Sequence, residues 1–328
     1  MSYRIFFVFS CFLFFISTAL TLLEVKYLKP QFLDFVQLHE KVYSSDKEHN
    51  YRFNVFMNNL KKAELLQKES QGTAKYGVTQ FSDLTDKEFK KHHLGLSVKT
   101  LNQKNFKTAK IPKIRLPKHF DWRKKHVVTE VKSQDVCASC WAFATTGNIE
   151  SLYAIKHKKL ISLSEQELLD CDKIDQGCTG GLMTDAYKAI MEIGGLETEQ
   201  SYPYYMKNMT CKFNKTKAAV SIKGAVTIPS NEKKMAKWLV KKGPIAVGIN
   251  SAELKFYQGG IASPNSTICD PKNIDHALLL VGYGVKDKIP FWILKNSWGS
   301  KWGENGYYRL RRGINACGIN VMPSSAIL

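Results

Sequence analysis

The sequence of 328 residues has no cysteine between Cys11 and Cys137, no internal repeat and no low-complexity segment. These absences exclude repeat proteins, and a hydrophobic content of 44% excludes an intrinsically disordered chain. After the first twenty residues no apolar run is long enough to cross a bilayer, so the sequence predicts no stable membrane anchor. The length suffices for a full hydrophobic core and a smaller accessory region.

Basic runs interleaved with aromatic residues are also missing. The formal net charge is +19, but the excess is shared between the first 115 residues and the rest. The longest basic clusters, 156–159 and 241–242, are short and contain no aromatic residue. We interpret them as solvated surface and expect no nucleic-acid partner. Binding to anionic glycans stays an alternative that rests on the charge alone.

The first residues have the three-part pattern of a signal peptide. Arg4 precedes the apolar stretch Ile5–Ile16, and small residues follow up to Ala19. We predict cleavage after Ala19 and entry into the secretory pathway, with a lysosomal or extracellular destination. Loss of the leader also removes Cys11, which leaves seven cysteines in a compartment that favours disulfides. Since seven is odd, one thiol is predicted to be unpaired.

The remaining chain divides into a cysteine-free front and a body that holds seven cysteines and all six tryptophans. From about Leu33 to Ser70, apolar residues recur at helical intervals, and Tyr76–Phe81 has the pattern of a strand. A lysine-rich stretch ending at Pro112 has the composition of a linker open to proteases. We predict a removable pro-region at 20–114 and a mature domain at 115–328.

Within the body, helical patterns precede strand patterns. The segment after Cys140 is apolar and helical in period, which predicts a central helix. Short runs of β-branched and aromatic residues follow Gly224, at Ile245–Ile249, Ala277–Val281, Phe291–Leu294 and Tyr307–Leu310. The order of these elements predicts an α+β fold with an antiparallel sheet in its second half.

Cys140 is the candidate nucleophile. A free thiol with a pKa near about 8.5 is mostly protonated at neutral pH, so a catalytic cysteine needs a group that stabilises its anion. The predicted helix would place its positive end at Cys140. An imidazolium would add to this effect, and among the four histidines of the body only His276 is embedded in an apolar strand pattern.

A histidine base needs a third group that fixes its tautomer. Asn296, twenty residues beyond His276, is the candidate on a neighbouring strand, and Trp298 would cover the hydrogen bond from water. The side-chain amide of Gln134, six residues before Cys140, would join the Cys140 backbone N–H in holding an oxyanion. A buried histidine or a lone asparagine is more often structural, so neither would count by itself.

The spacing of the cysteines argues against a metal or a redox site. Cys137 and Cys140 form a Cys-x-x-Cys pair, but Cys171 and Cys178 do not form the second close pair of a zinc ribbon. A thioredoxin-like motif would require a βαβ context that the sequence lacks. We therefore expect no metal and no cofactor.

Three segments together resemble the papain-like cysteine peptidases: residues 134–143, 275–277 and 296–299. They occur in the order of that family, with His276 and Asn296 at 136 and 156 residues beyond Cys140. The resemblance implies a two-lobed fold, with Cys140 on a helical lobe and His276 and Asn296 on an antiparallel, barrel-like lobe. It also implies peptide-bond hydrolysis through a thioester on Cys140, with proteins and peptides as substrates.

The front of the chain is similar to the pro-region of the cathepsin F-like subgroup. Gly77, Phe81 and Asp83 resemble a second pro-motif, with Thr79 where asparagine is usual. The resemblance implies a helical inhibitory pro-region that threads the cleft backwards, a monomeric enzyme and cystatin-type inhibitors. The helical pro-motif consists of Glu48, Arg52, Phe56, Asn59, Ala63 and Gln67.

The resemblance also implies disulfides and a substrate site, which the sequence alone leaves open because six cysteines allow fifteen pairings. The implied pairs are Cys137–Cys178, Cys171–Cys211 and Cys269–Cys317. Gly180 and Gly181 would pair with an extended substrate, although a glycine pair can also be a simple turn. The implied pocket is uncharged and predicts an apolar P2 side chain such as leucine. Its residues are Leu182, Met183, Gly248, Ile274, Ala277 and Met322.

One position departs from the family pattern, since Ala138 replaces a glycine. If that position requires positive φ, Ala138 would strain the loop and lower activity. The alternative function is therefore a weak or inactive homologue that acts by binding. We expect acid to loosen the pro-region by protonating carboxylates such as Asp83. Sequons at Asn208, Asn214 and Asn265 permit glycosylation.

Overall fold

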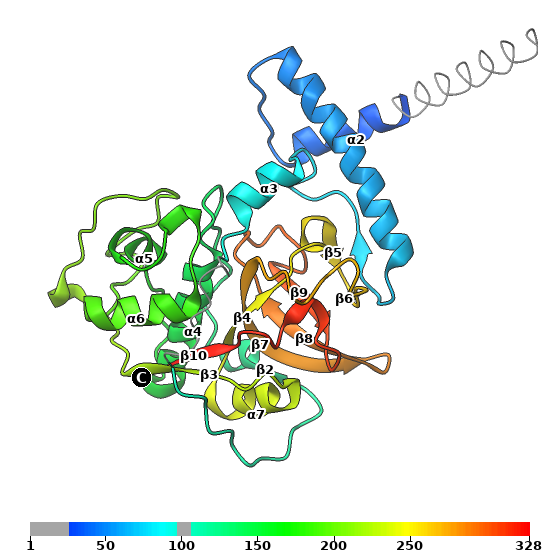
Figure 1. Ribbon diagram of the computed structural model, residues 1–328. Helices are drawn as coiled ribbons and strands as arrows, with labels where there is room; N and C mark the ends of the chain where they lie inside the picture. The colour runs from blue at the N-terminus through cyan, green and yellow to red at the C-terminus, as the bar shows by residue number, and fades with distance from the viewer. Residues whose placement is uncertain (1–25, 97–105) are drawn as a thin grey trace, which may run out of the picture.

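The protein is described by a computed structural model that covers residues 26–96 and 106–328. The predicted signal peptide at 1–19 and part of the predicted linker lie outside the described residues. Figure 1 shows the pro-region above two lobes, a helical lobe within 140–193 and a sheet lobe within 224–327. The predicted α+β class and two-lobed architecture are confirmed.

The predicted helical stretch from Leu33 to Ser70 is two helices. A helix covers 26–38, and the chain then turns at Glu40, which adopts a φ of 50°. The second helix starts where the Ser45 side chain accepts a hydrogen bond from the Glu48 N–H. The predicted strand at 76–81 is also shorter, because Thr79 and Ser82 form a turn. The remaining elements of the pro-region are α2 (Asp46–Glu69), β1 (Lys75–Tyr76) and α3 (Asp86–His93).

Polar side chains of α2 hold the segment that leads into α3. Arg52 donates to the Asp83 carbonyl at 3.1 Å and pairs with Glu88 at 3.0 Å. Asn59 donates to the carbonyls of Ser82 and Leu84, both at 2.8 Å. Phe56, on the same face of α2, is buried among aromatic rings of the first helix. The pro-region therefore has a small core and many polar ties.

The helical lobe is built around α4 (Cys140–His157), whose first fifteen residues are almost all buried. Lys158 ends this helix in the left-handed conformation. The basic residues Lys156 and His157 in the last turn suit the negative end of the helix dipole. Two shorter helices pack on α4, namely α5 (Glu165–Cys171) and α6 (Met183–Ile193). The short 3₁₀ turns η4 (Gly177–Thr179) and η5 (Lys215–Lys217) complete the lobe, while η3 (Trp122–Lys125) packs on β7 of the sheet lobe.

The sheet lobe has the strand order β3-β10-β4-β7-β8-β9-β6, with β2 paired to β7. All pairs in this sheet are antiparallel except β6 with β9. The four runs predicted as strands all lie in it. The strands are β2 (Phe120–Asp121), β3 (Gly224–Thr227), β4 (Ile245–Ile249), β5 (Tyr257–Gly259), β6 (Ile261–Ala262), β7 (His276–Lys286), β8 (Ile289–Lys295), β9 (Tyr307–Arg311) and β10 (Ser324–Ile327). The helices of this lobe are α7 (Glu232–Lys242), η6 (Leu254–Phe256) and η7 (Ala316–Gly318).

The two lobes meet where α4 packs against β7. A Cβ at Gly147 would lie 3.1 Å from the Leu279 side chain, so the small residue allows close approach. Asn148, fully buried on α4, donates to the Pro244 carbonyl and accepts from the Ala326 N–H. These contacts fix the middle of α4 against β7, β10 and the residue before β4. Within the described ranges, no helix is long and apolar enough to span a membrane.

Candidate active site

Cys140 is the first residue of α4 and is completely buried. Its N-cap, Ser139, makes no side-chain capping bond, which leaves the first N–H groups of the helix directed toward the site. The Ala277 N–H, from β7 of the other lobe, donates to the Cys140 sulfur at 3.4 Å. Cys140 is also the one free cysteine among the described residues. The sulfur therefore lies at the contact between the lobes.

His276 begins β7 and Asn296 follows β8, so sheet register brings these residues together. His276 Nε2 lies 2.8 Å from Asn296 Oδ1. The Trp298 ring lies 4.6 Å from the His276 ring and is itself 2% exposed. Because an amide oxygen can only accept a hydrogen bond, the Asn296 contact favours the His276 tautomer that carries its proton on Nε2. Nδ1 is then the basic atom of the ring.

Gln134 is held from both of its ends. Its side-chain oxygen accepts from the Ser297 hydroxyl at 2.7 Å, and its backbone N–H donates to the Ser297 carbonyl at 2.8 Å. Its Nε2 donates to the Cys137 carbonyl at 2.8 Å and lies 3.3 Å from the His93 carbonyl of the pro-region. A carbonyl oxygen of the pro-region thus faces the amide that would receive an oxyanion.

The pro-region segment after α3 fills the cleft. Leu96 lies parallel to Gly181, with the Gly181 N–H donating to the Gly95 carbonyl at 2.9 Å. On the other side, the Leu96 N–H donates to the Asp275 carbonyl at 3.1 Å. A Cβ on Gly95 would lie 1.8 Å from the Ala138 carbonyl, so only glycine fits there. The pro-region therefore covers Cys140 with backbone rather than with a bulky side chain.

The Leu96 side chain occupies the predicted apolar pocket. A Cβ on Gly248 would lie 2.7 Å from Leu96, Ile274 and Met322 alike, which places these three side chains around one point. Ala277, Leu182 and Met183 are also buried and belong to the same apolar cluster as Leu96. The structure thus brings together the pocket residues that the resemblance implied.

Burial determines the charge of the covered site. It raises the pKa of the Cys140 thiol to about 12, although backbone N–H groups of Ala277, Gly95 and Trp141 act in the opposite direction. It lowers the pKa of His276 to about 4, with the hydrogen bond to the Asn296 oxygen and the interaction with the His93 backbone opposing. Burial therefore favours the neutral forms of both groups while the pro-region covers the site, because it excludes the water that would solvate a thiolate–imidazolium pair.

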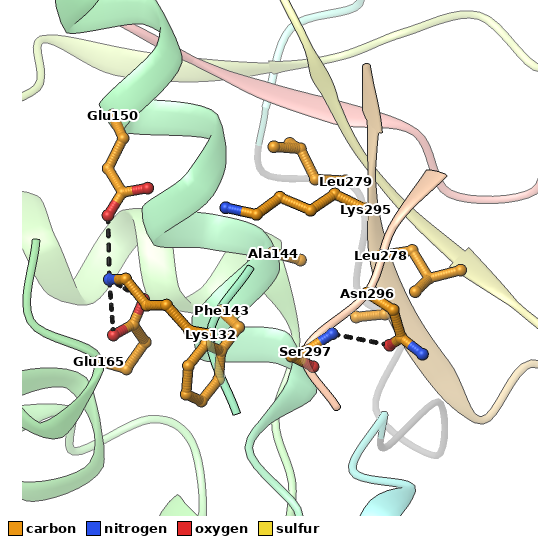
Figure 2. A pocket seen from close by; sticks show the side chains of 11 residues that line it. Lys132, Phe143, Ala144, Glu150, Glu165, Leu278, Leu279, Lys295, Asn296 and Ser297 are labelled. Carbon is orange, nitrogen blue, oxygen red and sulfur yellow. Dashed lines mark hydrogen bonds and ion pairs between the residues drawn. The ribbon is translucent and has the colours of Figure 1, made fainter. Parts of the chain in front are cut away.

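Beneath the site, charged groups surround a cavity of about 20 Å³, room for about one water molecule. Figure 2 shows Lys132 bonded to Glu150 and Glu165, at 3.0 and 2.7 Å, with Lys295 facing them from β8. Burial raises the pKa of Glu165 to about 7, and it lowers that of Lys295 to about 8. This network supports the strand end that leads to Asn296.

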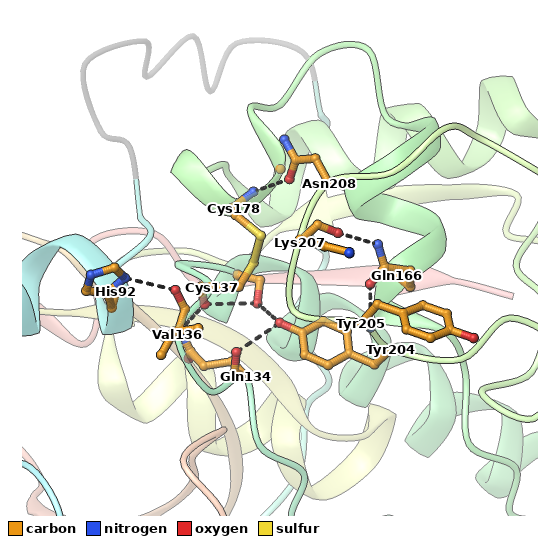
Figure 3. Close-up of a disulfide and its surroundings, with 12 residues drawn as sticks. His92, Gln134, Val136, Cys137, Gln166, Cys178, Tyr204, Tyr205, Lys207 and Asn208 are labelled. Atoms are coloured by element: carbon orange, nitrogen blue, oxygen red, sulfur yellow. Dashed lines mark hydrogen bonds between the residues drawn. A yellow bond between two sulfur atoms is a disulfide. The ribbon is translucent and has the colours of Figure 1, made fainter. Parts of the chain in front are cut away.

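The three disulfides have the pairing that the resemblance implied, Cys137–Cys178, Cys171–Cys211 and Cys269–Cys317. Figure 3 shows the first of them, with the Cys178 N–H donating to Asn208 at 2.8 Å. Strain at Ala138 was expected only if this position required positive φ, and Ala138 does not have positive φ. Asp135, with a φ of 47°, makes the turn instead. The Ala138 N–H donates to the Cys178 carbonyl at 3.2 Å, so a side chain is tolerated.

Residues 116–327 match the family described as papain family cysteine protease. The chain belongs to this family. Residues 32–89 match the cathepsin propeptide inhibitor domain (I29), so the papain-family domain carries its own inhibitor domain.

Relatives of known identity support the same assignment. Cathepsin F of Mus musculus is 48% identical over 301 residues, which cover 92% of this chain and 65% of the relative. Cathepsin F of Drosophila melanogaster is 48% identical over 295 residues, covering 87% and 48%. The chain thus spans about two thirds and about half of these relatives.

Among solved structures, the digestive procathepsin L2 of Tenebrio molitor superposes with a TM-score of 0.86 at 32% identity, covering 92% of this chain and all of that one. The recombinant stem bromelain precursor has a TM-score of 0.82 at 32% identity, covering 92% and 99%. The papain-like precursor fold therefore extends over the pro-region as well as the mature domain.

A second contact surface joins the pro-region to the papain-like domain. Strand β1 pairs antiparallel with β5, and Tyr76 donates to the buried Glu253 at 2.7 Å. Burial raises the pKa of Glu253 to about 7. Lys255, 3% exposed, donates to Asn59 at 3.1 Å and to Asp86 at 3.0 Å. Both buried charges are satisfied by groups of the pro-region.

Several residues of the covered site gave no signal in the sequence analysis. His93 and Leu96 follow a short capped helix, and nothing in their local pattern places them in a cleft 44 to 47 residues before Cys140. Lys132 and Glu165 read as ordinary surface charges. Their role is visible only in the structure, where they bond to each other, and the residues that enclose them come from both lobes.

Proposed function

We propose that this chain is the zymogen of a cysteine endopeptidase in which Cys140 is the nucleophile, His276 the base and Asn296 the group that orients it. Gln134 and the Cys140 backbone N–H would hold the oxyanion, and Trp298 would shield the His276–Asn296 hydrogen bond. The observation that carries the proposal is a free thiol at the start of a helix that accepts a hydrogen bond from Ala277, the residue after His276, on the other lobe. His276 Nε2 and Asn296 Oδ1 are 2.8 Å apart beside it.

The reaction proceeds in two steps. His276 takes the thiol proton, and the Cys140 sulfur attacks the peptide carbonyl to form a C–S bond and an oxyanion. The C–N bond then breaks as His276 gives its proton to the leaving amine, which leaves a thioester on Cys140. Water, deprotonated by His276, attacks the thioester and releases the carboxylic acid and the free thiol.

The proposed division of the chain is a signal peptide at 1–19, an inhibitory propeptide at 20–114 and the mature peptidase at 115–328. Residues 107–109 add to β3 through two hydrogen bonds with Thr227, of 2.8 and 3.2 Å. The residues after them, 110–115, are partly or fully exposed. A protease would reach this stretch without unfolding either part, which favours cleavage there.

The proposed substrate has an apolar residue such as leucine at P2. The Leu96 side chain fits among Ile274, Ala277 and Met322, and no charged residue belongs to that cluster. Gly180 and Gly181 would pair with the substrate backbone as Gly181 pairs with Gly95. Equal kcat/KM values for matched peptides with leucine and arginine at P2 would contradict this assignment.

Acid activation is proposed to act through His93 and through carboxylates such as Asp83. Asp83 is buried and accepts from Lys41 and Tyr43, both at 3.0 Å, so this carboxylate holds separate segments of the pro-region together. His93 is packed 4.6 Å from Phe81, and burial lowers its pKa to about 3, with His92, His276 and Lys41 contributing. A released His93 takes up a proton more readily, which favours release in acid.

The proposed location is a lysosome or the outside of the cell. Asn208, Asn214 and Asn265 are all exposed, which permits glycosylation. The proposed partners are protein and peptide substrates, the propeptide and cystatin-type inhibitors. The mature enzyme is proposed to be a monomer without a metal, cofactor, nucleic-acid partner or stable membrane anchor.

The decisive experiment is to acidify the purified precursor and to follow both the new N-terminus and the hydrolysis of a fluorogenic peptide with leucine at P2. Cys140→Ser should abolish hydrolysis and labelling by an epoxysuccinyl inhibitor, while the melting temperature changes little. Hydrolysis by the serine variant would refute the role of Cys140. A processed wild type that binds peptides without cleaving them would instead indicate a homologue that acts by binding.

A further inference from the structure

Tyr204 contacts both ends of the loop that leads into α4. Its hydroxyl donates to the Gln134 carbonyl at 3.0 Å and lies 2.8 Å from the Ser139 hydroxyl (Figure 3 shows Tyr204 directed at Gln134). Each hydroxyl has one proton. The tyrosine proton is directed to Gln134, and the Ser139 hydroxyl, which also lies 3.2 Å from the Cys137 carbonyl, shares its one proton between that carbonyl and Tyr204.

Those two loop ends carry the two proposed oxyanion donors. Gln134 supplies the side-chain amide, and Ser139 directly precedes the backbone N–H of Cys140. The side chain of Gln134 is fixed by Ser297, but its carbonyl is held by Tyr204. One side chain therefore connects the backbone beside one donor to the residue beside the other.

Tyr204 is itself held rigidly. Its ring meets Phe143, in the first turn of α4, edge-on at 5.1 Å, and its backbone N–H donates to Glu199 at 2.9 Å. Burial raises the pKa of Tyr204 well above its ordinary value, so the hydroxyl stays a donor at any pH where the enzyme would work. Rigid placement matters because a misplacement of about 1 Å at a reacting centre costs about a hundredfold in rate.

We propose that Tyr204 is a positioning residue of the oxyanion hole, which sets the distance between the Gln134 amide and the Cys140 N–H. This inference rests on the proposed peptidase function. Tyr204 touches no substrate; it acts through Gln134 and Ser139. Without the hydroxyl, the substrate should bind as before, but the donors should fit the tetrahedral intermediate less well.

Tyr204→Phe, made in the full precursor and matured in acid, tests the proposal. We expect kcat to fall about tenfold to a hundredfold with little change in KM, by analogy with loss of part of an oxyanion hole. The affinity for a peptide aldehyde, which forms a tetrahedral adduct, should fall by the same factor. Alkylation of Cys140 by iodoacetamide needs no oxyanion hole and should keep its rate.

Two further variants make the result specific. Tyr202→Phe is the matched control, since it removes a nearby hydroxyl that bonds Asp170 at 2.9 Å, and it should leave aldehyde affinity unchanged. In a Gln134→Ala background, Tyr204→Phe should cost less than about threefold, because the side-chain amide that Tyr204 positions is already absent. If Tyr204→Phe does not fold, Ser139→Ala breaks one of the two contacts and should show the same pattern at smaller size.

The proposal is overturned if Tyr204→Phe keeps its kcat, if alkylation slows as much as turnover, or if the loss is the same without Gln134. Failure of the proposed function looks different, because the matured wild type would then neither turn over peptide nor bind the aldehyde.

Discussion

The pro-region and the mature domain are stabilised in different ways. The pro-region has a small aromatic cluster of its own around Phe32, Phe35 and Phe56, no cysteine, and ion pairs that are partly or fully exposed. The mature domain has three disulfides, most of the residues of two large apolar clusters, and buried charges such as Glu150 that are paired. The difference indicates a durable enzyme that is held closed by a part which is easily unfolded.

The largest effect should come from the core of the pro-region. Phe56→Ala removes a completely buried ring and should cost about 3–5 kcal/mol, which a small core cannot absorb. We expect the precursor to lose latency at neutral pH, measured as labelling of Cys140 by an epoxysuccinyl inhibitor at least a hundredfold faster. Leu38→Ala, at a residue that is 70% exposed, is the control and should stay latent.

A matching change in the mature domain should leave latency alone. The double variant Cys171→Ser with Cys211→Ser opens a bridge between residues separated by 40 positions and should cost about 2–4 kcal/mol. The melting temperature of the processed enzyme should fall by several degrees in calorimetry, while Cys140 in the precursor stays protected from label. Faster labelling of this precursor would mean that the two parts are not stabilised independently.

His93 should connect the two regions through pH. Its pKa is about 3 when docked and near 6.5 when released, so docking is fully stable above pH 6.5 and weakens as the pH falls toward 3. At pH 5 this amounts to about 2 kcal/mol, because one unit of pKa is worth about 1.4 kcal/mol. His93→Phe keeps a ring but cannot be protonated, and we expect its processing at pH 5 to be at least tenfold slower.

The control for this prediction is the neighbouring histidine. His92 is half-buried and its side chain bonds the Val136 carbonyl at 3.0 Å, so His92→Gln, which can keep such a bond, should process nearly as the wild type does. An unchanged pH profile for His93→Phe would leave the carboxylates, among them Asp83, as the origin of acid activation. The protonation of His276, whose pKa is about 4 in the covered state, would act in the same direction.

The smallest effect is expected at an exposed ion pair between pro-region elements. Lys62 pairs with Asp86, with side chains 48% and 64% exposed, and such pairs contribute less than about 1 kcal/mol. Lys62→Ala should change the labelling rate of Cys140 less than about threefold at low salt and not at all in 1 M salt. A larger change would show that Lys62 is needed to keep Asp86 in its hydrogen bond with Lys255.

Much of the fold followed from patterns within single segments. The helix at Cys140, the four strand runs after Gly224 and the α+β class agree with their periodicity, because each segment buries one face or both. Boundaries in the pro-region were less accurate. The break at Glu40 and the short β1 depend on a left-handed residue and a turn, which periodicity does not register.

The sequence by itself determined the chemistry that is available: a thiol left over by an odd count, and a histidine and an asparagine at family spacing. Only the tertiary structure decided the state of that chemistry. Leu96 fills the pocket, burial favours the neutral forms of Cys140 and His276, and Tyr204 contacts both Gln134 and Ser139. Desolvation and hydrogen bonding act over a few ångströms between residues that are far apart in the chain, so no local pattern encodes them.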